Sequence, residues 1–187
     1  MRERIIKGSI EEIQEKGMKF TMDDLSSRIG ISKRTLYEQF SSKTEILEAI
    51  IDQTFGELDA KTQAIINDAT LSLIGKIKEV FTILPTYYEI FDVRILEQMK
   101  KSFPAQWEKL AAELNSDWEE LRALIEQATR EGVIRPVDTD LLIKLMIDAS
   151  NTTLDQRYFS KHNMSVETAL ESIIEILLYG LIPREKQ

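Results

Sequence analysis

The chain has 187 residues, with 24 Lys and Arg against 32 Asp and Glu and a formal net charge of −8 at pH 7. A hydrophobic fraction of 43% and a charged fraction of 30% are typical of globular proteins and exclude a disordered one. The absence of cysteine excludes a disulfide framework, a zinc–thiolate site and a thiol redox switch. The longest apolar run, 176–182, is far shorter than the ~20 residues of a membrane helix, and no signal segment is recognisable. We therefore expect a cytoplasmic protein with no membrane partner.

The charge is unevenly distributed along the chain. Residues 1–47 contain nine basic and eight acidic residues, whereas the remaining 140 residues carry a net charge of −9. Within 28–43 four basic residues stand against one acidic residue. An acidic body commonly reflects only solubility, but a locally basic N-terminal unit attached to it favours two functions on one chain.

The start of the chain has the pattern of three short helices. Apolar spacing predicts the first helix over about 3–16, with Gly17 as its C-terminal stop. Thr21 is the expected N-cap of a second helix, which ends at Gly30. Ser32 is the expected N-cap of the third. These helices form a small unit of their own.

The sequence also predicts helices over the rest of the chain. Ser42 and Glu45 form a capping box for a long fourth helix over about 43–67. The spans expected after it are 71–84, 87–102 with a break near Asp92, 104–131, 138–159 and 165–181. The sequence therefore predicts an all-α protein of about nine helices, in which the fourth joins the N-terminal unit to a larger helical bundle.

Residues 21–40 have the layout of a helix-turn-helix that reads DNA. The two short helices meet at a tight turn, where Gly30 provides the positive-φ residue. The second of them exposes Lys33, Arg34 and Thr35 in its first turn, and the free amides of a helix N-terminus already favour phosphate. A recognition helix presents such residues to base edges in the major groove.

Two kinds of DNA contact follow from this layout. Lys33 or Arg34 could reach guanine O6 and N7, which is worth roughly 1–3 kcal/mol of discrimination per good pair. Thr21, Tyr37 and Lys43 occupy a cap, a helix end and a helix start, which suit phosphate contacts. The alternative is a plain αα corner with a solvated charged face. The clustering of the cations on one exposed turn and the partly exposed Tyr37 argue against it.

Residues 30–47, GISKRTLYEQFSSKTEIL, resemble the signature of the TetR (tetracycline-repressor) family. The frame of the first helix with Gly17, Phe20 and Thr21 also fits, as does the segment 131–136 followed by two long helices. Beyond about the first 47 residues the chain resembles the family only in the order and size of its helices. The resemblance implies a DNA-binding domain over 1–47, with its motif at 21–40, and an effector-binding and dimerisation domain over 48–187.

The resemblance further implies a homodimeric, one-component transcription regulator, most often a repressor. Such a protein binds a palindromic double-stranded DNA operator through its third helix, under the control of a small-molecule effector. The DNA-binding residues carried over are Thr21, Ser32, Lys33, Arg34, Thr35, Tyr37 and Lys43. Arg34 departs from the family, in which this position is often small. The short N-terminus leaves little arm for the minor groove, so we expect specificity to rest mostly on the third helix.

The C-terminal body is expected to hold the effector pocket and the dimer interface. By resemblance, the last two long helices pair with those of a second subunit, although the wide apolar stripe of 165–181 would also suit a monomer core. The candidate pocket residues are Phe81, Tyr88, Trp107, Trp118, Asn151 and Asp155. The acidic body favours a hydrophobic, neutral or cationic effector over an anionic one.

Catalysis, a cofactor and a metal site are not expected. His162 is the only histidine and lies in a polar stretch, so neither a Ser/His/Asp nor a Cys/His arrangement is available. Glycine-rich phosphate loops and His/Cys metal ligand sets are also absent from the sequence. The alternative to a DNA-binding regulator is a helical interaction module on the same fold that acts mainly through protein partners.

Overall fold

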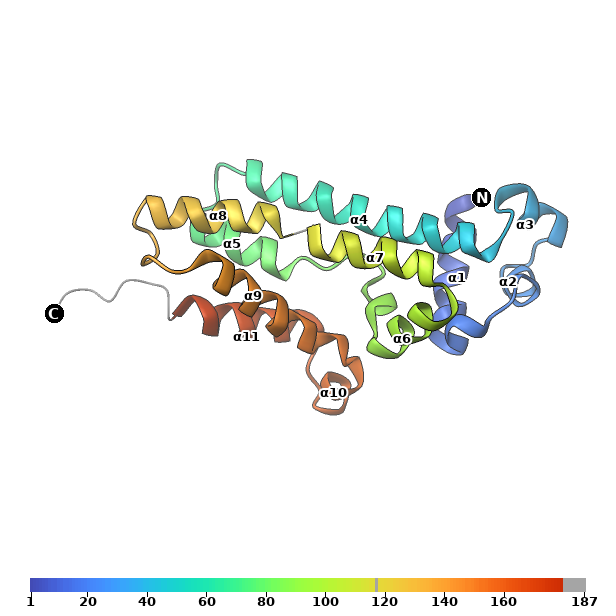
Figure 1. Cartoon of the computed structure of the whole chain (residues 1–187). Coiled ribbons are helices and arrows are strands. Elements are labelled where there is room, and N and C mark those ends of the chain that lie inside the picture. Colours follow the sequence, from blue (N-terminus) through green and yellow to red (C-terminus); the bar gives the residue numbers. More distant parts are fainter. Residues whose placement is uncertain (117, 180–187) are drawn as a thin grey trace. The chain divides into compact units, whose positions relative to one another are not determined.

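The computed structural model describes residues 1–116 and 118–179, whose regular structure is helical throughout. These residues form eleven α-helices and three short 3-10 helices, η1 to η3 (Figure 1). The predicted all-α class is confirmed. Among the helices in this part of the chain, none combines the length and apolar character that a membrane span requires.

The first three helices share one core at the N-terminal end of the long helix α4 (Lys43–Asn67). They are α1 (Arg2–Lys16), α2 (Met22–Ile29) and α3 (Lys33–Gln39), with η1 (Gly17–Lys19) between the first two. Their buried side chains include Ile5, Ile10, Ile13, Phe20, Leu25, Leu36 and Phe40. Gly8 permits the close approach of α1 to α2, because a Cβ at this position would lie 2.3 Å from Cγ2 of Ile29.

The chain forms two compact units that differ from the division expected from the sequence. The first unit comprises Met1–Glu57 and Pro85–Glu113, and the second comprises Leu58–Leu84 and the chain from Leu114 onward. The first unit therefore adds η2 (Tyr88–Phe91), α6 (Val93–Ser102) and most of α7 (Pro104–Ser116) to the three N-terminal helices. The boundary expected after Leu47 is a proposed division by function, and it stays a prediction.

The second unit is a helical bundle built around α5 and α11. Its helices are α5 (Leu73–Thr82), α8 (Glu119–Arg130), α9 (Thr139–Asn151), η3 (Thr152–Leu154), α10 (Gln156–Lys161) and α11 (Val166–Tyr179). Helix α5 packs against α8 and α11, and α9 packs against the same two helices. The buried side chains include Ile77, Phe81, Leu121, Ile125, Met146, Leu170, Ile174 and Leu178.

The single helix expected over 104–131 is two helices, α7 and α8. Helix α8 begins after Trp118, whose indole N–H donates to the carbonyl oxygen of Leu114 at 3.1 Å. The indole ring packs edge-to-face on Phe81, with 6.1 Å between the ring centroids. Apolar spacing continues through this break, so the sequence pattern does not reveal it.

The helix expected over 138–159 ends early. Thr152 and Thr153 donate their hydroxyls to carbonyl oxygens of α9, both at 2.7 Å, and Asp155 then caps α10 by accepting from the backbone N–H of Tyr158 at 3.2 Å. Short polar side chains that bond the nearby backbone compete with helix continuation. The break predicted near Asp92 is confirmed, since Asp92 is the N-cap of α6. The expected end of the last helix, at residue 181, lies outside the described residues.

Candidate nucleic-acid interface

The turn between α2 and α3 is built by local side-chain caps. At the start of α2, Thr21 Oγ1 accepts from the backbone N–H of Asp24 at 3.1 Å, and the carboxylate of Asp24 accepts from the backbone N–H of Thr21 at 2.8 Å. This is a complete capping box. Gly30 ends α2 in the left-handed region, with φ +63° and ψ +45°, which confirms the positive φ expected there.

The N-terminal turn of α3 faces solvent. Ser32 caps the helix by accepting from the backbone N–H of Thr35 at 3.0 Å, and the hydroxyls of these two residues are 2.9 Å apart. Leu36 is fully buried, which fixes the opposite side of α3 against the core of the first unit. Because Leu36 points inward, the neighbouring Lys33 and Arg34 are exposed, as is half of Tyr37. These residues therefore share one accessible helix end.

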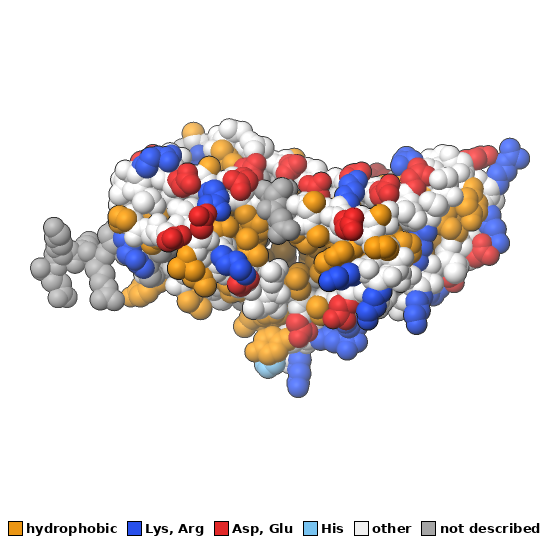
Figure 2. All heavy atoms as spheres, viewed as in Figure 1, with side chains coloured by type: hydrophobic (Ala, Val, Ile, Leu, Met, Phe, Trp, Pro, Cys, Tyr) orange, Lys and Arg blue, Asp and Glu red, His pale blue; other side chains and the backbone are white. Residues whose placement is uncertain are grey.

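The two cations of this turn are each paired with a carboxylate. The ammonium of Lys33 lies 2.6 Å from the carboxylate of Asp23 on α2, and Arg34 Nε lies 2.9 Å from the carboxylate of Glu38, one turn further along α3. Neither pair was expected from the sequence. Only the second has a local signal, the spacing of four residues on one helix. Figure 2 shows acidic side chains interspersed with Lys and Arg over the surface of α1 to α3.

Lys43 has a different environment from Lys33. It is half-buried, and its ammonium donates to the carbonyl oxygens of Met18 and Phe20, both at 2.7 Å. Burial lowers the pKa of Lys43 to about 8, partly offset by the negative charge of Asp24. The ammonium thus remains charged at pH 7 and binds the backbone that leads into α2.

Arg2 is a further cation close to α3 and was not among the DNA-binding residues expected from the sequence. Its guanidinium donates to the carbonyl oxygen of Gln39 at 2.7 Å and lies 4.0 Å from the ring centroid of Phe40. A cation beside the last carbonyls of a helix is favourable, and the contact holds the N-terminus of α1 against the end of α3. The basic residues at the N-terminus were the sequence feature that could have pointed to Arg2.

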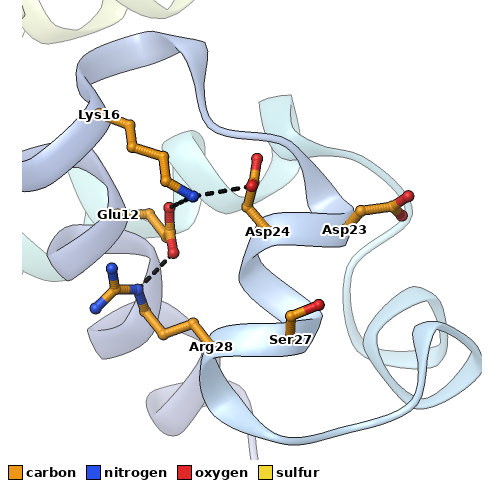
Figure 3. Close-up of a pocket in the computed structure, with 6 residues that line it drawn as sticks. All are labelled: Glu12, Lys16, Asp23, Asp24, Ser27 and Arg28. Atoms are coloured by element: carbon orange, nitrogen blue, oxygen red, sulfur yellow. Dashed lines mark hydrogen bonds and ion pairs between the residues drawn. The ribbon is translucent and has the colours of Figure 1, made fainter.

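An open pocket of about 580 Å³ lies beside α1 and α2 (Figure 3). Its lining residues are Glu12, Lys16, Asp23, Asp24, Ser27 and Arg28. Glu12 is 2% exposed and is paired with both Arg28 and Lys16. Burial alone would raise the pKa of Glu12, but the hydrogen bonds from these two cations outweigh it and lower the pKa. Four of the lining residues therefore form an ion-pair network that joins α1 to α2: Glu12, Lys16, Asp24 and Arg28.

The candidate effector residues are spread over both units. In the second unit, Phe81 is buried and contacts the half-buried Trp118. Tyr88 and Trp107 are half-buried residues of the first unit. The ammonium of Lys100 lies 5.7 Å from the centroid of the Trp107 ring. The remaining two, Asn151 at the end of α9 and Asp155 at the start of α10, are exposed. The structure thus brings together two members of the set, the aromatic rings in the second unit.

The described residues hold no cluster of three or more His, Cys, Asp or Glu side chains that could bind a metal ion. His162 is exposed, and its Nδ1 lies 2.7 Å from the carbonyl oxygen of Tyr158. The two rings are tilted by 34° to one another, with 4.4 Å between their centroids. Its environment is that of a surface side chain.

Comparisons with known proteins agree with this geometry. Residues 5–50 match the model of the family described as bacterial regulatory proteins, tetR family. The chain is 31% identical to an uncharacterized HTH-type transcriptional regulator, YvaF, of Bacillus subtilis, over 100% of this chain and 98% of that protein. The crystal structure of the TetR family transcriptional regulator PfmR of Thermus thermophilus matches with a TM-score of 0.76 and 26% identity, over 94% of this chain and 97% of that one. FadR of Bacillus subtilis, solved in complex with stearoyl-CoA, shares the fold with a TM-score of 0.72 and 17% identity, over 96% of this chain and 99% of that one.

Proposed function

Because the chain belongs to the TetR family of bacterial transcriptional regulators, which are not enzymes, we propose that it is a homodimer that binds a palindromic operator through α3. The observation that carries this proposal is the exposed N-terminal turn of α3, held by the cap of Ser32 and the buried Leu36. A turn fixed in this way can enter the major groove with its side chains facing base edges.

We assign the DNA contacts by exposure. Lys33, Arg34 and Thr35 would contact bases and the adjacent backbone, whereas Thr21 and Tyr37 would contact phosphates and set the register. For Lys43 we propose a positioning role in place of the phosphate contact expected from the sequence. Its ammonium already binds two backbone carbonyls, and it would have to leave them to reach a phosphate.

A palindromic operator requires two copies of α3 at a spacing of about 34–36 Å, hence a two-fold dimer. Large apolar side chains are exposed on two helices that pack together, α9 and α11. They are Leu141 (59% exposed), Leu145 (48%), Ile176 (73%) and Tyr179 (86%). Apolar groups exposed on neighbouring helices are typical of an association surface. We propose that this α9/α11 surface is covered by a second copy of the chain.

We also propose that a small molecule bound to the C-terminal domain controls DNA affinity, with the Phe81–Trp118 pair as part of its site. The net charge of −9 on residues 48–187 favours a neutral or cationic apolar effector. The structural relative FadR was solved with stearoyl-CoA, an anionic ligand, so both classes have to be tested. Trp118 fluorescence offers a direct readout, with Trp107→Phe as the background that leaves Trp118 as the single tryptophan.

The experiment that tests the proposed function is selection of binding sites from fragmented genomic DNA, followed by fluorescence anisotropy titration at several salt concentrations. If the protein is a sequence-specific DNA-binding regulator, the selection enriches a palindromic site. The logarithm of the association constant for that site then falls by about 0.9 per neutralised phosphate for each unit of log salt concentration. Shallow, sequence-blind binding with no enriched site would instead favour the alternative, a helical module that acts through protein partners.

A further inference from the structure

Both cations of the proposed recognition turn are occupied by carboxylates of the same domain. In the Lys33–Asp23 pair both side chains are 62% exposed, and in the Arg34–Glu38 pair the exposed fractions are 89% and 55%. Ion pairs with this much exposure contribute little to stability. The two ion pairs therefore add little to the stability of the fold, but they determine the net positive charge that α3 presents to DNA.

Asp23 is separate from the ion network that joins α1 to α2. Figure 3 shows its carboxylate pointing away from Glu12, Lys16 and Arg28, whereas Asp24 faces them. Asp24 makes the capping box with Thr21 and the ion pair with Lys16. The carboxylate of Asp23 accepts from Lys33 and takes no part in the capping box of Thr21 and Asp24, so it can be neutralised without removing the cap of α2.

We propose that Asp23 and Glu38 are internal counterions of the recognition turn and that they raise the selectivity of the protein for its operator. A carboxylate beside Lys33 or Arg34 occupies the place that a DNA phosphate would take. This inference rests on the proposed function, because it concerns how α3 distinguishes operator from other DNA.

The physical basis is that binding to operator DNA and binding to unrelated DNA depend on different interactions. Binding to unrelated DNA depends almost entirely on net neutralised phosphates, to which a cation paired with its own carboxylate adds nothing. At the operator, a base edge that matches Lys33 or Arg34 offers a hydrogen-bonding geometry that outweighs an exposed ion pair. The cations thus leave their carboxylates at the matching site and stay paired elsewhere.

The test uses the isosteric variants Asp23→Asn, Glu38→Gln and their combination in the full chain. Each is titrated by anisotropy against the selected operator duplex and a scrambled duplex of equal length, over a series of salt concentrations. On scrambled DNA we expect each substitution to steepen the slope of log K against log salt by about 0.9, and the double substitution by about 1.8. We expect the affinity for scrambled DNA to rise roughly two- to fivefold per substitution, with a smaller rise on the operator.

Two controls separate this effect from a general change in charge. Glu97→Gln removes one negative charge from an exposed position on α6 of the same unit. Asp23→Glu keeps a carboxylate at this position and should keep the wild-type slope of log K against log salt. If Asp23→Asn and Glu38→Gln change the slope and the operator-to-scrambled ratio no more than Glu97→Gln does, the inference is wrong while the proposed function stands. If the wild-type protein itself selects no operator, both fail.

Discussion

The ammonium of Lys43 lies 4.0 Å from the ring centroid of Phe20 and donates to the carbonyl oxygen of the same residue at 2.7 Å. It also donates to the carbonyl of Met18 and lies 5.0 Å from the ring centroid of Phe103. One side chain at the start of α4 thus binds the backbone of η1 and of Phe20, the residue that follows it. This segment determines where the helix-turn-helix begins relative to α4.

The first prediction concerns this contact. Lys43→Met keeps most of the apolar stem but leaves two part-buried carbonyls without their donor. We expect a loss of about 1–3 kcal/mol in the free energy of unfolding, since unsatisfied buried polar groups cost that much. Urea denaturation followed by circular dichroism measures it. The matched variant Lys33→Met, at an exposed position, should change the free energy by less than about 0.5 kcal/mol. Equal effects of the two substitutions would contradict the positioning role.

A second prediction is an acid-sensitive contribution from Asp24. The ion pair with Lys16 and the hydrogen bonds from Thr21 lower the pKa of Asp24 well below its ordinary value. Since the folded-state pKa is depressed, the stabilisation is fully present above the unfolded-state pKa of about 3.9 and is lost as the pH falls below it. The difference in unfolding free energy between wild type and Asp24→Asn should therefore shrink between about pH 5 and pH 2. A difference that stays constant over this range would show that Asp24 stabilises the fold without its charge.

The third prediction concerns the proposed base contacts. Replacing Lys33 and Arg34 together by Glu should abolish operator binding and leave the dimer and the thermal unfolding curve unchanged, because both side chains are exposed. Loss of each good base contact alone is worth roughly 1–3 kcal/mol. The matched control replaces Lys100 and Lys101 on α6 by Glu, which gives the same change in net charge. Normal operator binding by the α3 variant in anisotropy titrations would rule out the assignment.

The fourth prediction tests the α9/α11 surface. Ile176→Glu places a charge on the proposed dimer interface, where each substitution counts twice by symmetry. Loss of a buried Ile side chain costs about 1.5–3 kcal/mol, so the dimer should weaken by roughly 3–6 kcal/mol. Sedimentation equilibrium should then show monomers with a helical content unchanged by circular dichroism. Ala105→Glu, at an exposed position on α7, should leave the dimer intact. A dimeric Ile176→Glu protein would place the interface elsewhere.

Local signals were sufficient to predict the helix-turn-helix. Thr21 and Ser32 cap their helices through backbone groups three residues away, and Gly30 takes a left-handed conformation that its own lack of a Cβ permits. The break at Asp92 has the same origin. Because such features depend on residues close in the chain, the all-α class, the early helix boundaries and the candidate recognition turn could be predicted from the sequence alone.

Long-range packing determines which charged side chains near that turn are paired, buried or exposed. The pairing of Lys33 with Asp23 joins two helices across ten residues of sequence, and the inward placement of Lys43 depends on carbonyls more than twenty residues away. The division at Trp118 likewise accompanies a contact with Phe81 on another helix. Periodicity and capping report the preferences of a short segment, whereas ion pairs and ring contacts depend on which segments pack together. The pairing of Lys33 with Asp23 and the burial of Lys43 could therefore be read only from the folded chain.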